Sequence, residues 1–178
     1  MKHTILSFLL VCSPFLYAQQ YCMTAGPTSN ADSNVKLVQM TGVLGVINHI
    51  GCPSVLGVQN LTAQNVTINA GGTYSLSVEF GTCGGNYAGV GQVWIDFDQN
   101  MVFDPNESVG TWTGIPPAVA TVFVANVPVN AQNGITRMRV TQREGGVLPL
   151  DPCASFQWGS TMDFGITIAN GMDCTGYI

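Results

Sequence analysis

The stretch that decides the fold reads Gln92-Val-Trp-Ile-Asp-Phe-Asp-Gln-Asn-Met-Val-Phe-Asp-Pro-Asn-Glu-Ser108. It begins as a strand, because Val93, Trp94 and Ile95 are residue types that favour extended backbone with a buried face. Acidic and amide side chains then replace the apolar ones within a few residues. We therefore expect a buried strand that leads directly into an acidic loop.

The acidic part of this stretch has the ligand spacing of a calcium-binding loop. Counted from its first acid, oxygen-bearing side chains stand at positions 1, 3, 5, 9 and 12, and position 7 can offer its backbone carbonyl. Ca²⁺ is a hard ion that takes about six to eight oxygen ligands, and a Glu at position 12 can supply two of them. The predicted ligands are Asp96, Asp98, Asn100, Val102 through its carbonyl, Asp104 and Glu107.

Two features separate this loop from a helix–loop–helix calcium site. Met101 stands where such loops have Gly, and a left-handed backbone at a non-glycine residue costs about 1 kcal/mol. The flanks are strand-like rather than helical. The alternative is a solvated acidic turn, but five ligand-type residues in register favour calcium. A glycosidase acid pair fits less well, because Asp96 and Asp98 lie two positions apart among further acids.

Alternating apolar and polar residues predict further strands on both sides of the loop. The clearest is 73–80, where apolar side chains point to one face and Thr, Ser and Glu to the other. Similar patterns cover 119–127, 135–142 and 162–168. Short strands separated by Gly and Pro turns are typical of an all-β fold. We expect one antiparallel β-sandwich domain, jelly-roll or immunoglobulin-like, over residues 19–178.

The N-terminus has the features of a signal peptide. Lys2 and His3 form a short polar region, an apolar run follows, and Ala18 ends a sequence typical of a cleavage site. The apolar run is too short to span a membrane and is broken by Pro14. Residues 1–18 are therefore predicted to be removed, which leaves a secreted or cell-surface domain without membrane insertion.

Charge excludes some partners and cysteine content suggests others. Loss of Lys2 leaves a net charge of about −6 without a basic patch, which argues against nucleic acid and anionic membranes as partners. Cysteines in an exported chain form disulfides. Connectivity does not follow from sequence alone, and the pairs we expect are Cys22–Cys52 and Cys83–Cys153. Cys174 would then stay free or link two copies into a homo-oligomer.

Several motifs together resemble a known family. Trp94-Ile-Asp-Phe-Asp-Gln-Asn100 with Phe103-Asp104 resembles the WIDWNQDGDFDD signature of GEVED domains, which are modules of secreted and cell-surface proteins. The motifs at 21–22, 71–74 and 136–140 resemble other landmarks of the family in the same order. The resemblance thus covers nearly the whole mature chain, and it implies a β-sandwich, calcium, and an accessory role in adhesion or substrate attachment.

The motif that gives the family its name is altered here. Gly159 and Asp163 match it, but Ser160 and Met162 replace its two glutamates. Any role of those glutamates is therefore absent, whereas a role of Asp163 can persist. Asp163 is a candidate for an additional ligand or for the carboxylate that orients an arginine.

Other side chains have both a structural and a functional interpretation. Arg137, Arg139 and Arg143 lie on or beside one predicted strand, and we expect cross-strand pairing with Asp163 or Glu79. His49 is expected to be structural, because no nucleophile or acid stands near it in the sequence.

Trp112 follows the acidic loop and has two open interpretations. It can cover an edge of the sandwich, or it can stack on a sugar ring bound beside calcium. These patterns predict a secreted calcium-binding β-sandwich module for adhesion or for attachment to an extracellular glycan or surface protein, and not an enzyme. The alternatives are a structural subunit of an extracellular assembly and an accessory domain of a larger secreted protein, such as a hydrolase.

Overall fold

The computed structural model describes residues 20–170, which form ten strands and one short 3₁₀ helix. The strands are β1 (Gly26–Ser29), β2 (Ser33–Thr41), β3 (Leu44–Ile50), β4 (Val58–Asn69), β5 (Thr73–Thr82), β6 (Gly89–Ile95), β7 (Ser108–Gly114), β8 (Thr121–Asn126), β9 (Gly134–Glu144) and β10 (Ser155–Ala169). The helix η1 spans Pro105–Glu107. The predicted signal peptide 1–18 and Cys174 lie outside the described residues. Between residues 20 and 170, no helix has the length and apolarity needed to span a bilayer.

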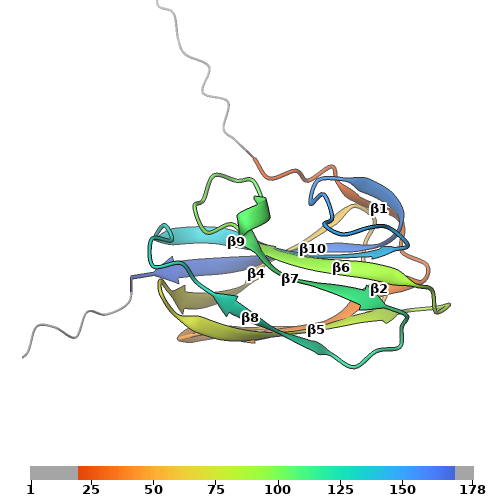
Figure 1. Cartoon of the computed structure of the whole chain (residues 1–178), viewed down its shortest axis with the longest axis horizontal. Coiled ribbons are helices and arrows are strands. Elements are labelled where there is room, and N and C mark those ends of the chain that lie inside the picture. Colours follow the sequence, from red (N-terminus) through yellow and green to blue (C-terminus); the bar gives the residue numbers. More distant parts are fainter. Residues whose placement is uncertain (1–19, 171–178) are drawn as a thin grey trace, which may run out of the picture.

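The strands form one strongly bent sheet that nearly closes on itself (Figure 1). Its order is β7-β6-β9-β10-β4-β3-β2-β5-β8, and β1 adds beside β10. The end strands β7 and β8 lie in contact. The all-β prediction is therefore confirmed, but the architecture is a barrel-like single sheet rather than two separate layers.

One short link makes the sheet continuous. Strands β3 and β4 pair only at Leu44 with Thr67 and at Gly45 with Val66. Gly42 permits this approach, because a Cβ there would lie 2.0 Å from the carbonyl oxygen of Thr67. Gly45 has a φ of +76°, which glycine adopts without strain. Gly42 and Gly45 thus permit the close approach of backbones that joins the two halves of the sheet.

The expectation of a purely antiparallel fold is wrong at β10. This strand pairs in parallel with both β1 and β4, and antiparallel with β9. Apolar alternation indicates which face of a strand is buried but carries no information on the direction of its neighbour. The parallel pairs arise because β1 and β4, from the first half of the chain, pair with β10, which is the last strand of the chain.

Two hydrophobic clusters lie on opposite faces of the strands β6, β9 and β10. The main cluster fills the space between the halves of the sheet and includes Phe80, Met138 and Phe164. His49 packs edge-on against the ring of Phe164, with centroids 5.9 Å apart. The second cluster covers the outer face and consists of Val90, Trp94, Phe103 and Leu150. Phe103 belongs to the acidic loop, so this outer cluster anchors the loop to the sheet.

The disulfides join Cys22 to Cys153 and Cys52 to Cys83, so the expected pairing is wrong although the same four cysteines are used. The first bridge follows from the parallel pairing of β1 with the start of β10. The second follows from β2, which pairs with β3 on one side and β5 on the other and brings the ends of both close together.

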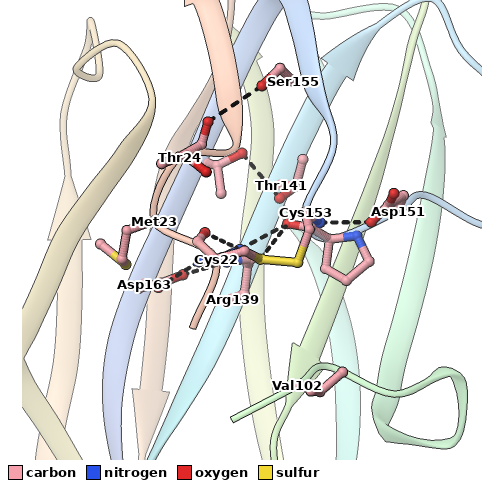
Figure 2. The surroundings of a disulfide bond; sticks show 12 residues. Cys22, Met23, Thr24, Val102, Arg139, Thr141, Asp151, Cys153, Ser155 and Asp163 are labelled. Atoms are coloured by element: carbon pink, nitrogen blue, oxygen red, sulfur yellow. Dashed lines mark hydrogen bonds and ion pairs between the residues drawn. A yellow bond between two sulfur atoms is a disulfide. The ribbon is translucent and has the colours of Figure 1, made fainter. Parts of the chain in front are cut away.

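A buried ion pair lies on the outer face beneath the first disulfide (Figure 2). Arg139 and Asp163 are both fully buried and form a bidentate pair, with Nε–Oδ1 at 2.7 Å and Nη2–Oδ2 at 2.8 Å. The third nitrogen, Nη1, donates to the carbonyl oxygens of Cys22 at 3.2 Å and Pro152 at 2.8 Å. The guanidinium also lies 4.9 Å from the ring centroid of Phe103. One arginine thus holds the N-terminal segment, the loop before β10 and the acidic loop.

We expect Arg139→Leu to lower the free energy of unfolding by about 3–5 kcal/mol, because it leaves the buried carboxylate of Asp163 without its main partner. Denaturant unfolding measures this. Lys36→Met is the control, since it breaks the partly exposed Lys36–Glu79 pair and should cost less than about 1 kcal/mol. The double variant Arg139→Leu/Asp163→Leu should be more stable than the single one. If Arg139→Leu lost no more stability than Lys36→Met, the stabilising role of the buried ion pair would be contradicted.

Candidate metal centre

The acidic loop leaves β6 at Ile95 and returns through η1 to β7. Within it, Asp96, Asp98 and Glu107 each have a carboxylate oxygen within 4.8 Å of the others. Asp96 and Glu107 are buried, whereas Asp98 is exposed. The loop therefore brings together three of the six predicted ligands, with one of them open to solvent.

Asp96 is fully buried and is only half satisfied. Its Oδ2 accepts hydrogen bonds from the hydroxyl of Tyr21 and, at 3.1 Å, from the backbone N–H of Met101. Its Oδ1 has no hydrogen-bond partner among residues 20–170. Burial raises the pKa of this carboxyl above its ordinary value. An ionised oxygen without a partner in a buried position is what a bound cation would satisfy.

Glu107 closes the loop through hydrogen bonds. Its Oε1 accepts from the N–H groups of Phe97 at 2.7 Å and Asp98 at 3.3 Å, and its Oε2 accepts from the N–H of Asp104 at 3.0 Å. Burial raises the pKa of this carboxyl, and the three N–H groups act in the opposite direction. The predicted use of both oxygens for the ion is therefore restricted, because Oε1 already holds two donors. Oε2 keeps one lone pair for a ligand.

The remaining predicted ligands lie in the loop but outside this group of three. The amide nitrogen of Asn100 donates to Oδ2 of Asp98 at 3.2 Å and to Oδ2 of Asp104 at 2.8 Å. Its Oδ1 accepts from the N–H of Val102 at 2.7 Å. Asn100 therefore links two carboxylates through a neutral donor, and the side chain of Val102 is exposed.

The backbone of the loop contains two left-handed residues. Met101 has a φ of +65° and Gln99 a φ of +56°. Met101 therefore adopts the left-handed conformation for which calcium loops use glycine at this position. Left-handed non-glycine residues cluster at functional loops, where surrounding contacts hold them in place.

Two residues that sequence spacing did not reveal complete the surroundings of Asp96. Tyr21 comes from the N-terminal segment, and its ring packs 5.2 Å from that of Phe103. Burial, followed by its hydrogen bond to Asp96, raises the pKa of the Tyr21 hydroxyl. Thr136 of β9 donates through Oγ1 to the carbonyl oxygen of Asp96 at 2.6 Å. The one signal for Tyr21 is its position beside Cys22, whose disulfide fixes this segment over the loop.

Asp163 and Trp112 lie elsewhere. Asp163 pairs with Arg139 and, through Oδ2, with Arg137 at 3.2 Å, so it acts as the carboxylate that orients arginines. Trp112 pairs with Gly91, in the part of β6 away from the acidic loop, and stacks on Phe80 with centroids 5.1 Å apart. It is half-buried against the main core, so one ring face is already occupied. A role in sugar stacking stays a prediction.

The donor set fits a hard cation. The three clustered side chains all coordinate through carboxylate oxygen, and one of them, Asp96, is buried with an oxygen that no described residue contacts by a hydrogen bond. Oxygen donors without His or Cys suit Ca²⁺ and do not suit zinc. The loop has one exposed acid, Asp98, through which an ion can enter.

Comparison with known proteins identifies the part of the chain that contains this loop. Residues 90–167 match the model of the family described as the GEVED domain. The resemblance seen in the sequence is therefore confirmed for this range, which runs from β6 into β10 and includes the whole acidic loop. A search for similar curated proteins finds no match.

We expect Met101→Gly to stabilise the protein by about 0.5–1 kcal/mol. Glycine removes the left-handed strain, and its larger loss of backbone freedom on folding offsets part of the gain. Thermal and denaturant unfolding measure the difference. Val102→Gly is the matched control, since both side chains are similarly exposed, at 41% and 42%, but φ is positive only at Met101. The control should be destabilised, and equal losses in both variants would exclude strain at Met101.

The raised pKa values of Asp96 and Glu107 predict a pH dependence of the metal-free protein. In the unfolded chain, Asp and Glu carboxyl groups have pKa values of about 4. Above that pH, the native chain keeps protons on these two groups that the unfolded chain releases. These two groups therefore contribute less stability as the pH rises through their raised pKa values. Denaturant unfolding in chelator should show a wild-type protein that loses stability, relative to Asp96→Asn, as the pH rises. A constant difference between the two proteins would contradict the prediction.

Proposed function

We propose, on the premise that residues 90–167 form a GEVED domain, that the protein is a secreted calcium-stabilised module that attaches to an extracellular glycan or surface protein. In this proposal the two facing halves of the bent sheet act as the layers of a β-sandwich, and the acidic loop is its calcium site. The observation that carries the proposal is the buried Oδ1 of Asp96, which lacks a hydrogen-bond partner within the described part of the chain and lies beside two further carboxylates.

The electrostatics of the loop favour a bound cation. Three carboxylates within 4.8 Å repel one another, and burial of two of them removes the water that would screen this repulsion. Asp96, Asp98 and one oxygen of Glu107 would hold the ion. Asn100, Asp104 and the backbone carbonyl of Val102 belong to the same loop and would be further ligands. Bound Ca²⁺ would supply positive charge that offsets this repulsion and ties the loop to β6.

A weak site would suffice outside the cell. Extracellular calcium modules work with dissociation constants on the order of 10⁻⁴–10⁻³ M. An ion that binds only the folded chain stabilises it by mass action. We infer that calcium rigidifies the loop, and that the rigid loop presents a surface for attachment.

A small pocket beside the ion site supports attachment rather than catalysis. It has a volume of about 120 Å³ and is bounded by the acidic loop and the turn before β9. Asp98 and Glu107 line it together with the amide side chains of Asn106 and Asn130. Amide and carboxylate groups around a cation suit the hydroxyl groups of a sugar. Both oxygens of Glu107 are engaged with backbone N–H groups, which does not suit the proton transfer that a hydrolase requires of a general acid or base.

The second candidate is a structural subunit of an extracellular assembly. It is favoured by large apolar side chains that remain exposed on the outer face of β3 and β8. These residues are Leu44, Val46, Ile50, Val122 and Val124. Such a surface would suit packing against other copies, and this candidate takes first place if the loop does not bind calcium.

The decisive test is thermal unfolding in chelator and then in excess calcium. At a free concentration about 100-fold above the dissociation constant, Ca²⁺ should add about 2.7 kcal/mol of stability. Asp96→Asn should abolish this gain and should also raise the midpoint in chelator, because it removes a buried charge that is only half satisfied by the described residues. Glu79→Gln makes the same charge change in an exposed pair far from the loop in sequence, and should keep the calcium response.

Two results would count against the calcium site. The first is an unchanged wild-type midpoint in calcium, which would make the loop an acidic turn. The second is an equal calcium response in wild type and Asp96→Asn, which would place the ion elsewhere.

A further inference from the structure

A second pocket, of about 280 Å³, opens on the outer face of the sheet and borders the candidate metal centre through Tyr21 and Thr136, which contact Asp96. The N-terminal segment and the strands β4, β9 and β10 form its walls. The lining residues are Tyr21, Thr62, Ile135, Thr136, Arg137 and Gly165. Its one charged side chain is Arg137.

Arg137 carries positive charge that its neighbours do not balance. Its Nη1 contacts Oδ2 of Asp163 at 3.2 Å and the sulfur of Met23 at 3.2 Å. Both oxygens of Asp163 already accept shorter hydrogen bonds from Arg139, and a thioether is a weak acceptor. Two guanidinium groups therefore share one carboxylate. All hydrogen bonds of Arg137 to the described residues come from Nη1, so the other nitrogens are free for an anion.

The surroundings hold the guanidinium in place and leave room beside it. Its carbon lies 4.6 Å from the ring centroid of Tyr21, which fixes the plane of the group. Gly165 is its partner in the register of β9 with β10. Position 165 cannot carry a side chain, because a Cβ there would lie 2.5 Å from the carbonyl oxygen of Thr62. The backbone of β4 therefore packs closely against β10 at Gly165 and bounds the pocket beside Arg137 on this side.

The rest of the lining suits a sugar more than a bare ion. The side chain of Ile135, which is 80% exposed, and the part of the Tyr21 ring that Arg137 and Phe103 leave uncovered offer apolar surface for the C–H groups of a pyranose. The hydroxyl of Thr62 donates to Asn60 at 2.7 Å and can still accept a hydrogen bond from a sugar hydroxyl. A fixed guanidinium beside these groups matches a planar carboxylate in a bidentate arrangement.

We propose that this pocket binds the carboxylate of an acidic sugar, a hexuronate residue, with Arg137 as the residue that determines specificity. The proposal rests on the proposed function in one respect, since it names the class of glycan to which the module attaches. It does not rest on calcium, because none of the lining residues is a predicted ligand. On a chain with net negative charge, this half-buried and incompletely paired arginine would favour an anionic ligand at the pocket.

The competing explanation is structural: Arg137 would only support the ring of Tyr21 and the carboxylate of Asp163. A structural role predicts that Arg137→Gln lowers stability and changes no ligand affinity. Arg137→Lys separates the two further, because lysine keeps the charge but loses the planar fork.

The test is titration of ¹⁵N-labelled protein with sodium glucuronate, glucose and N-acetylaspartate, in chelator and again in calcium. We expect glucuronate to shift the amide signals of Thr62, Thr136 and Gly165 in both conditions, and the other two compounds to leave them in place. Arg137→Gln should weaken glucuronate binding at least about tenfold. Arg137→Lys should lie between it and wild type. Arg143→Gln removes an equal charge outside the pocket and should bind as wild type does.

Three outcomes would overturn the proposal. Equal shifts with glucose would show that the pocket does not recognise the carboxylate. Equal shifts with N-acetylaspartate would show that it does not recognise the sugar. Unchanged affinity in Arg137→Gln, with thermal unfolding showing a folded protein, would leave Arg137 a structural role only. If calcium did not raise the unfolding midpoint but glucuronate still bound, the calcium site would be refuted and the proposal for this pocket would be unaffected.

Discussion

The buried pair of Arg139 and Asp163 is the interaction on which the arrangement of the outer face depends. Its two charges lie side by side on β9 and β10, and the remaining guanidinium nitrogen donates to carbonyl groups of the segments around Cys22 and Cys153. The same guanidinium covers the ring of Phe103 in the acidic loop. Because neither charge has access to water, each requires the other, and the segments that cover them are held by the same need.

The acidic loop contains interactions that destabilise the fold. It buries two carboxylates close to a third and holds Gln99 and Met101 in left-handed conformations. The surroundings maintain it through Phe103 in the outer cluster and through the hydrogen bonds that Glu107 accepts from the loop backbone. A loop kept in an unfavourable state by its neighbours is suited to a cation, because the ion would relieve the repulsion that the fold imposes.

The pattern of strands could be predicted because it is local, and the pairing of strands could not because it is not. Alternation identified the buried faces of β5, β9 and β10, and these faces meet in the main core. It did not indicate that β10 has parallel neighbours, that β3 joins the two halves, or which cysteines meet. The first disulfide joins residues 131 positions apart in the sequence, and no spacing within either segment reports on the other.

For the candidate site, the sequence by itself determined the acidic loop and its oxygen donors, whereas the left-handed backbone at Met101 was seen only in the structure. Ligand spacing within one loop depends on local geometry, which neighbouring residues encode. Only the tertiary structure decided that most lone pairs of Glu107 accept hydrogen bonds from backbone N–H groups, and that Asp163 pairs with arginines. It also placed Tyr21 against Asp96, across 75 positions of sequence. The reason is that hydrogen-bond partners of buried charges come from whichever segments pack over them, and packing is settled by the sheet as a whole.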